Sequence, residues 1–325
     1  MSRSISATAA APPIDATATS RSTPPDFETA QRALFNAVGL EVRSRFVDLD
    51  APSVRTHLFE AGPPDGERTR LFVHGGGSFG AFLAPLVARL VDERVVGFDR
   101  PGYGLSGPFD YDRRTLAGVD VATLDGVVDA LGVERVDLVG HSMGGYASVR
   151  YALARPDRVR RLVLIGACAA FPGTWPPLPL RLLTVPVVSR VLQRLQPSGE
   201  AGALAVAEVF GERDAVAANP AVLQAMVAHE ADPVSSAAGL SELGAFFSLR
   251  GWHPSVELRP ADLQRLEPPS LLVWGEDDPI AAPDDIREGV ADIPDARLEV
   301  VPGAHAPFLT HPARCAGLVG DFLDV

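Results

Sequence analysis

The stretch Gly140-His-Ser-Met-Gly144 decides the fold of this chain. It follows the apolar run 136–139 and leads into a segment, 146–154, whose residues are typical of a helix. The G-x-S-x-G pattern alone also occurs in ordinary turns, so the strand before it and the helix after it carry the interpretation. A serine at such a tight strand-to-helix corner is held in a strained turn that pushes its hydroxyl out of the sheet. The stretch therefore predicts a nucleophilic serine, Ser142.

Groups that could activate this serine follow two predicted strands near the C-terminus. The apolar run 270–274 is followed by Gly275-Glu-Asp-Asp-Pro279, and the alternating run 297–301 is followed by Pro302-Gly-Ala-His305. A serine hydroxyl is a weak nucleophile at neutral pH, so it needs a base, and the base needs an orienting acid. Because the carboxyl ends of parallel strands lie at one edge of a sheet, these groups should meet there. The chain order is then serine, aspartate, histidine.

With these motifs the chain resembles the α/β-hydrolase family from about Arg55 to its C-terminus. Five motifs occur in the family's order: His74-Gly-Gly-Gly77, Phe98-Asp-Arg-Pro-Gly-Tyr-Gly-Leu-Ser106, the serine corner, Trp274-Gly-Glu-Asp-Asp278 and Gly303-Ala-His305. The resemblance implies an α/β fold with a mostly parallel central sheet flanked by helices. In the family the acid usually sits three residues past the strand-end glycine, which favours Asp278 over Asp277. The implied catalytic residues are Ser142, Asp278 and His305.

Two backbone amides are expected to form an oxyanion hole. Acyl transfer develops negative charge on the substrate carbonyl oxygen, which two preorganised N–H groups can stabilise by a few kcal/mol. One donor should be the N–H of Met143, the residue after the nucleophile. The other should come from the glycine loop, from Gly76 or, as the fallback, Gly77, because bare glycines let a substrate approach the backbone closely. An ordinary glycine turn is the alternative interpretation. We expect His74 to anchor this loop.

The alternation of strands and helices indicates how the chain is divided. Helical spacing from 116 to 131 precedes the strand at 136, a rhythm that implies a parallel sheet. The rhythm breaks after 169, where Pro-rich turns and helical stretches continue until strand character returns at Ser270. The sequence predicts a hydrolase core at 31–168 and 262–325, with a helical cap at 169–261, inserted after the sixth strand. An independent helical domain is the alternative. Residues 1–30, rich in Ala, Ser, Thr and Pro, are predicted to be a disordered tail.

Composition excludes several classes of function. The chain has 325 residues, 46% of them hydrophobic, and a formal net charge of -12. This charge disfavours nucleic acids and anionic bilayers as partners. All 29 basic residues are arginine, which removes Schiff-base chemistry and the P-loop lysine. No run of about 18 apolar residues occurs, so no membrane span is expected. The oligomeric state is not predicted.

Cysteine usage indicates a reducing compartment. Cys168 and Cys315 are the two cysteines, without metal-ligand spacing or a disulfide framework. Both this and the absence of an apolar signal-peptide core in the first 26 residues favour a cytoplasmic location. We expect Cys168 to be buried. Metal-binding motifs are absent, and the predicted chemistry needs no cofactor.

Three other patterns have weaker interpretations. Gly102-Tyr-Gly-Leu-Ser-Gly107 has the spacing of a dinucleotide fingerprint, but it is followed by a loop rather than a helix, so we expect a loop at the mouth of the active site. His229-Glu230-Ala-Asp232 resembles a metal cluster only loosely, and a solvated helix end is favoured. The apolar stretch 177–188 is expected to line the inner face of the cap and the acyl pocket.

These features predict a serine hydrolase that cleaves a carboxylic ester through an acyl-enzyme, acting on a small molecule with an apolar, uncharged acyl group. Thioesterase, lactonase, amidase, perhydrolase and carbon–carbon bond hydrolase activities are alternatives on the same fold. Carbon–carbon bond hydrolases of the family usually carry Trp after the catalytic histidine, where this chain has Ala306. The alternative of another class is a non-catalytic ligand-binding or pathway accessory protein.

Overall fold

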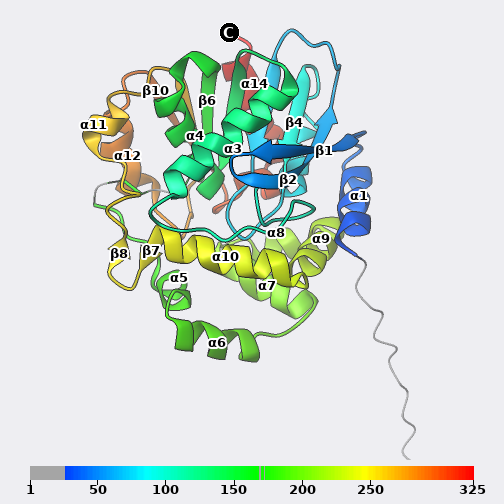
Figure 1. The fold of residues 1–325 in the computed structure, drawn as a ribbon, viewed down its shortest axis with the longest axis vertical. Helices are drawn as coiled ribbons and strands as arrows, with labels where there is room; N and C mark the ends of the chain where they lie inside the picture. Colours follow the sequence, from blue (N-terminus) through cyan, green and yellow to red (C-terminus); the bar gives the residue numbers. More distant parts are fainter. Residues whose placement is uncertain (1–25, 168–169, 172) are drawn as a thin grey trace, which may run out of the picture.

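A computed structural model describes residues 26–167, 170–171 and 173–325, and in this part of the chain an eight-stranded sheet forms the centre (Figure 1). The strand order is β1-β2-β4-β3-β5-β6-β9-β10. The strands are β1 (Arg43–Asp50), β2 (Ser53–Ala61), β3 (Thr69–Val73), β4 (Arg94–Phe98), β5 (Val136–His141), β6 (Val159–Ile165), β9 (Ser270–Gly275) and β10 (Ala296–Val301). Strands β1, β2 and β4 pair antiparallel, and β4 to β10 pair parallel. The predicted mostly parallel sheet is confirmed.

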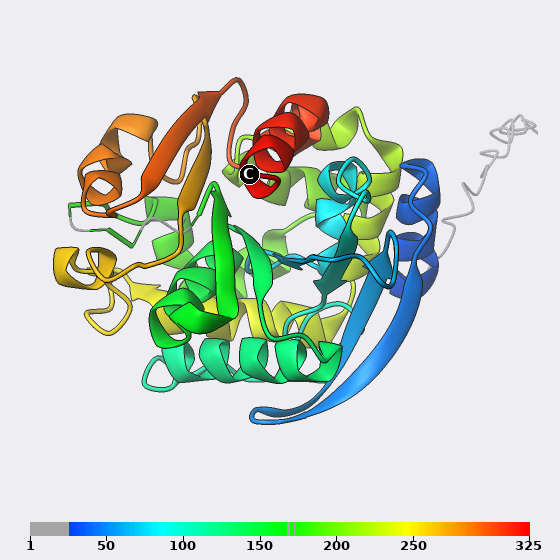
Figure 2. The same cartoon turned by 90° about the horizontal axis from the view of Figure 1, so that it is seen from above.

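Helices cover both faces of this sheet. In Figure 2, α3 (Leu116–Leu131) lies on one face and α14 (Pro312–Leu323) on the other. The remaining helices outside the cap are α1 (Phe27–Ala37), η1 (Gly80–Leu83), α2 (Ala84–Val87), α4 (Met143–Ala154), η2 (Pro156–Arg158), α11 (Pro260–Leu263), α12 (Pro283–Ala291) and α13 (Pro307–Thr310).

The central strands β3, β4, β5, β6 and β9 are buried on both faces because they are apolar at most positions, whereas the edge strand β1 is largely exposed. In β6, Leu162 and Leu164 belong to one hydrophobic layer, and Val163 and Ile165 belong to the other. Successive side chains of a strand point to opposite faces, so a continuous apolar run supplies both layers. This burial fixes the positions of the strand ends that carry the site.

The helical insertion follows the sixth strand, as predicted. Between β6 and α11 the chain forms helices and a short hairpin, which lie below the sheet in Figure 1, and we call this segment the cap. It comprises α5 (Leu178–Leu183), α6 (Pro186–Leu195), α7 (Glu200–Val209), α8 (Arg213–Ala217), α9 (Pro220–Glu230), α10 (Pro233–Phe246), β7 (Phe247–Ser248) and β8 (Gly251–Trp252).

The predicted disordered tail, 1–30, is too long. Helix α1 begins at Phe27, inside that range, because the Asp26 carboxylate caps it by accepting the N–H of Thr29 at 2.8 Å. Leu34 and Phe35 then bury the apolar face of the helix. Residues 1–25 and Cys168 lie outside the described residues. Among the residues that are described, no helix is long and apolar enough to cross a bilayer.

Candidate active site

Ser142 occupies the corner between β5 and α4. Its φ of 53° and ψ of -124° are values that a residue with a side chain adopts only under strain. A Cβ on Gly140 would lie 2.6 Å from Cα of Gly145, and one on Gly144 would overlap the carbonyl oxygen of His74. Side chains at these flanking positions are therefore excluded by contact, and the predicted corner is confirmed.

The three residues predicted to form a triad lie together. Nε2 of His305 is 2.8 Å from Oγ of Ser142. Nδ1 of His305 is 3.0 Å and 3.1 Å from the two carboxylate oxygens of Asp278. Asp277, the alternative acid, is exposed. Asp278 is only 4% exposed and also accepts the N–H of Ile280 at 2.8 Å. A continuous hydrogen-bonded path thus joins the buried carboxylate to the serine hydroxyl.

His305 is held by the cap as well as by the core. The ring of Phe210, at the end of α7, stacks on the His305 ring with 5.5 Å between centroids and 25° between planes. Oε1 of Glu212 accepts the N–H of Ala306 at 2.5 Å. On the core side, Nε2 of His141 donates to the His305 carbonyl at 3.2 Å. His141 therefore hydrogen-bonds beside Ser142.

The glycine loop after β3 packs against Ser142. A Cβ on Gly75 would lie 2.8 Å from Cβ of Ser142, so the loop backbone approaches Ser142 closely. His74 anchors it: Nδ1 donates to the Gly75 carbonyl at 2.7 Å, and Nε2 accepts the N–H of Arg100 at 2.9 Å. Burial lowers the pKa of His74 to about 3, which keeps this ring neutral. The expected anchoring role is confirmed.

The amides predicted to hold an oxyanion are free to bind a ligand. Met143 is the first residue of α4, where N–H groups have no partner within the helix. Within the described part of the chain, no hydrogen bond uses the N–H of Gly76 or Gly77. A Cβ on Gly76 would overlap Sδ of Met143, so these two residues are in close contact.

A family model described as the alpha/beta hydrolase family matches residues 71–318, which span the sheet, the cap and the three residues of the hydrogen-bonded path. The chain belongs to the alpha/beta hydrolase family.

Several named proteins are similar to this chain. A 2-hydroxy-6-oxononadienedioate/2-hydroxy-6-oxononatrienedioate hydrolase from Cupriavidus pinatubonensis is 36% identical over 42% of this chain, and the match spans about half of that relative, 48%. Hydrolase 2 of the same name from Pseudomonas putida is 28% identical over 86% of this chain and 96% of the relative. Among solved structures, carboxylesterase CesB from Bacillus subtilis superposes with a TM-score of 0.71 and 22% identity over 91% of this chain and 96% of CesB. This last similarity shows the fold alone.

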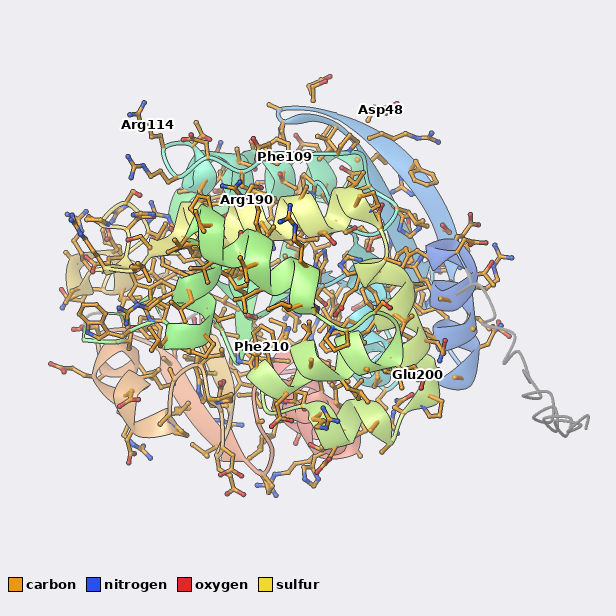
Figure 3. All side chains as sticks on the ribbon, turned by 90° about the horizontal axis from the view of Figure 1, so that it is seen from below. Asp48, Phe109, Arg114, Arg190, Glu200 and Phe210 are labelled. Atoms are coloured by element: carbon orange, nitrogen blue, oxygen red, sulfur yellow. The ribbon has the colours of Figure 1, made fainter. Side chains whose placement is uncertain are left out.

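Two cavities meet at Ser142. A small one of about 60 Å³ extends behind the glycine loop, and a large one of about 1510 Å³ opens beneath the cap. Both are lined by Gly76, Gly77, Ser142, Val206, Phe210, His229, Glu230 and His305. Figure 3 views the cap side, where Glu200 and Phe210 mark the two ends of α7. Of the apolar stretch 177–188, Pro177, Leu180 and Leu183 line the large cavity as expected, whereas Leu178 and Val187 are exposed.

The end of α9 differs from the sequence-based expectation. A solvated helix end was expected at 229–232, but His229 is 4% exposed and lines both cavities. Its ring packs against Phe79 and Tyr103, which shield it from water. Burial lowers the pKa of His229 to about 4, so its ring is neutral at physiological pH. Burial raises the pKa of Glu230, which follows it, to about 7.

The glycine-rich loop at 102–107 has a structural role that the sequence did not predict. It lines neither of the two cavities at Ser142, so the expectation of a loop at the active-site mouth is wrong. Instead it faces α10 of the cap, where the Tyr103 hydroxyl donates to Glu242 at 2.5 Å and Arg100 pairs with the same buried carboxylate. No helix opens within the loop, since α3 begins at Leu116. The loop therefore attaches the cap to the core.

Sequence reasoning did not identify Glu212, His229 and Glu230 as site residues. All three belong to the cap, far along the chain from the motifs that mark the triad. The one available signal, which concerns His229 and Glu230 only, was the run His229-Glu230-Ala-Asp232 at the end of a helical stretch, and composition alone places that run in solvent.

Proposed function

We propose that this hydrolase cleaves a carboxylic ester by two-step acyl transfer, with Ser142 as the nucleophile. The observation that supports the proposal is the hydrogen-bonded path from Asp278 through His305 to Ser142, whose links measure 3.0 Å and 2.8 Å. This arrangement can remove a proton from the serine hydroxyl while it attacks a carbonyl carbon.

The mechanism assigns one role to each group. His305 takes the serine proton through Nε2, and Asp278 orients the ring and stabilises its positive charge. The N–H groups of Met143 and Gly76, with Gly77 as the fallback, donate to the oxyanion of the tetrahedral intermediate. His305 then protonates the leaving alcohol and activates the water that releases the acid.

The larger cavity favours an apolar group on one side of the scissile bond. Leu180, Leu183, Leu243 and Phe247 line it together with residues of the glycine loop. Burial of apolar substrate surface there provides roughly 25 cal/mol per Å². A small-molecule ester with an apolar, uncharged acyl group is the substrate class that fits this lining.

A second candidate is cleavage of a carbon–carbon bond, which the names of the relatives favour. The compound in those names is a ketone with two carboxylates and no ester, so its hydrolysis breaks a carbon–carbon bond. Two features of this chain argue for an ester instead. Ala306 follows the histidine, and the acidic residues Glu212 and Glu230 line the small cavity, where they would repel a dicarboxylate.

A fluorophosphonate probe and a panel of aryl esters of increasing acyl length test the proposal. We expect the probe to label Ser142 covalently and Ser142→Ala to lower turnover about 10⁴-fold with unchanged thermal unfolding. Ser255→Ala, which removes an exposed serine hydroxyl outside both cavities, is the matched control. Absence of labelling would favour a ligand-binding or accessory protein. A Ser142→Ala variant that keeps more than about a tenth of wild-type turnover would refute the nucleophile.

A further inference from the structure

Three residues that line the small cavity have a buried polar atom with no hydrogen-bond partner in the described residues. They are Nδ1 of His229, Nδ1 of His141 and Oγ of Ser78. A buried donor or acceptor left unpaired costs about 1–3 kcal/mol. Native structures keep such atoms where a ligand or an ordered water satisfies them. Three such atoms on residues that line one cavity beside Ser142 favour a polar group as its occupant.

Glu230 adds a carboxylate to the same cavity, and the fold does not account for it. It is the last residue of α9, where the helix dipole disfavours a negative charge. Its side chain makes no hydrogen bond or ion pair with any described residue, and it lies across from Gly202 of α7. A half-buried carboxylate in this position destabilises the helix end, so its presence calls for an explanation outside folding.

The charged side chains that line the small cavity, apart from the neutral histidines, are the acidic residues Glu212 and Glu230. Neither cavity at Ser142 has an arginine among its described lining residues, and the chain contains no lysine. Burial keeps the pKa of His141 and of His229 below the ordinary value, so both rings are neutral. Glu230 and Glu212 are thus the groups that determine the local potential. An anion placed here would be repelled, whereas a cation or a neutral donor would be attracted.

From these contacts we infer that the small cavity binds a substrate group that donates hydrogen bonds, an ammonium or a hydroxyl, with Glu230 as the residue that selects it against a carboxylate. The inference rests on the proposed ester hydrolysis at Ser142 and names the substrate class for it. A volume of about 60 Å³ admits a short group of a few heavy atoms. The apolar part of the substrate then lies in the large cavity.

The test is a matched set of para-nitrophenyl esters of propanoate, β-hydroxypropanoate, β-alanine and malonate, assayed at about pH 8, where carboxylates and aliphatic amines are both charged. A second set carries the same end groups on the alcohol side of acetate esters, with a dimethylamino group as the amine. Each kcat/KM is divided by the rate of hydroxide-catalysed hydrolysis of the same ester, which removes differences in intrinsic reactivity.

In at least one set, we expect the amine ester to exceed the carboxylate ester roughly tenfold or more, the discrimination that about 1.4 kcal/mol provides. Glu230→Gln should reduce this ratio by about tenfold, since it removes the charge and keeps the shape. If Glu230→Gln lowers the amine-to-carboxylate ratio alone, the bound group is an ammonium. If it lowers the hydroxyl-to-carboxylate ratio equally, the bound group is a neutral donor.

The control is Glu208→Gln, which removes an exposed carboxylate from the same cap outside both cavities and should leave the ratio unchanged. Equal rates for amine and carboxylate esters in both sets, or a ratio that Glu230→Gln does not alter, would overturn the inference. Failure of the proposed function looks different: the uncharged propanoate ester would not be cleaved, and Ser142 would not be labelled. Thermal unfolding of Glu230→Gln checks that the variant folds.

Discussion

Oε1 of Glu212 accepts a hydrogen bond of 2.5 Å from the backbone N–H of Ala306, the residue directly after His305. Glu212 lies between α7 and α8 of the cap, and Ala306 lies in the loop that follows β10 of the core. Both residues are buried, and burial raises the pKa of the Glu212 carboxyl. A cap residue thus fixes the loop that carries the proposed catalytic base.

Replacing Glu212 by Ala should lower kcat roughly tenfold with little change in KM. The change leaves the buried Ala306 N–H without an acceptor, a penalty of about 1–3 kcal/mol, and the loop can relieve it by moving His305 away from Ser142. Glu212→Gln keeps an acceptor oxygen and should restore most of the activity. Steady-state kinetics of both variants test this positioning role. Equal kcat for Glu212→Ala and wild type, or equal losses in the Ala and Gln variants, would contradict it.

Ser142→Gly should raise stability while it removes activity. Ser142 holds a φ of 53° and a ψ of -124°, a conformation that glycine adopts freely. Strain at such a residue is worth about 1–3 kcal/mol, so relieving it should raise the free energy of unfolding by about 1 kcal/mol, net of the extra entropy of the unfolded glycine. Denaturant unfolding measures the difference. Ser142→Ala serves as the control, since it loses the hydroxyl but keeps the Cβ and the strain. A glycine variant no more stable than the alanine variant would show that the corner is unstrained.

The core of the fold and the convergence of Ser142, Asp278 and His305 were predictable from local sequence. The corner at Ser142 needs glycines at fixed positions, and the strands before it and before Asp278 and His305 are apolar runs. In parallel sheets the carboxyl ends of such strands meet at one edge, so motifs far apart in the chain could be placed together without coordinates. The parallel sheet thus determines where residues at the ends of its strands lie relative to one another.

The positions of the cap residues could not be predicted in this way from the sequence. Its helices pack by side-chain contacts that have no fixed register along the sequence, so burial at individual positions was not predictable. His229 illustrates the difference: it ends a helix in a polar stretch, yet Phe79 and Tyr103 bury it beside the cavity. The start of α1 inside the predicted tail depends likewise on tertiary burial of Leu34 and Phe35. Local composition cannot report such contacts.

The buried ion pair between Arg100 and Glu242 should show strong coupling. Arg100 and Glu242 are 2% and 0% exposed, and Tyr103 and Asp120 surround the pair. Arg100→Met leaves the Glu242 carboxylate buried and uncompensated, which costs about 3–5 kcal/mol. Glu242→Gln should cost less, because the Asp120 carboxylate lies 3.6 Å from Arg100 and still pairs with it. The double variant should lose much less than the sum of the two. Denaturant unfolding of the four proteins gives the coupling free energy.

The exposed pair of Arg287 and Asp284 is the control for that cycle, with an expected coupling below about 1 kcal/mol. Additive losses for Arg100→Met and Glu242→Gln would mean that the two charges do not depend on each other. The attachment of α10 to the glycine-rich loop would then rest on apolar contacts.

Glu230→Gln should change the pH dependence of stability in a defined direction. Burial raises the pKa of this carboxyl from an ordinary value of 4.5 to about 7. A carboxyl whose pKa is higher in the folded state favours folding below its unfolded pKa, and this contribution is lost as the pH rises through the folded value. Wild type therefore loses stability through this group between pH 4.5 and about pH 7, whereas glutamine does not titrate.

The free energy of unfolding of the variant minus that of wild type should grow across this window and level off above it. Urea unfolding at a series of pH values measures the difference, with Glu208→Gln giving the reference slope for loss of an exposed carboxylate from the cap. A difference that shrinks as the pH rises would mean that Glu230 has a favourable partner in the folded protein, and its carboxylate would then not be available to a substrate.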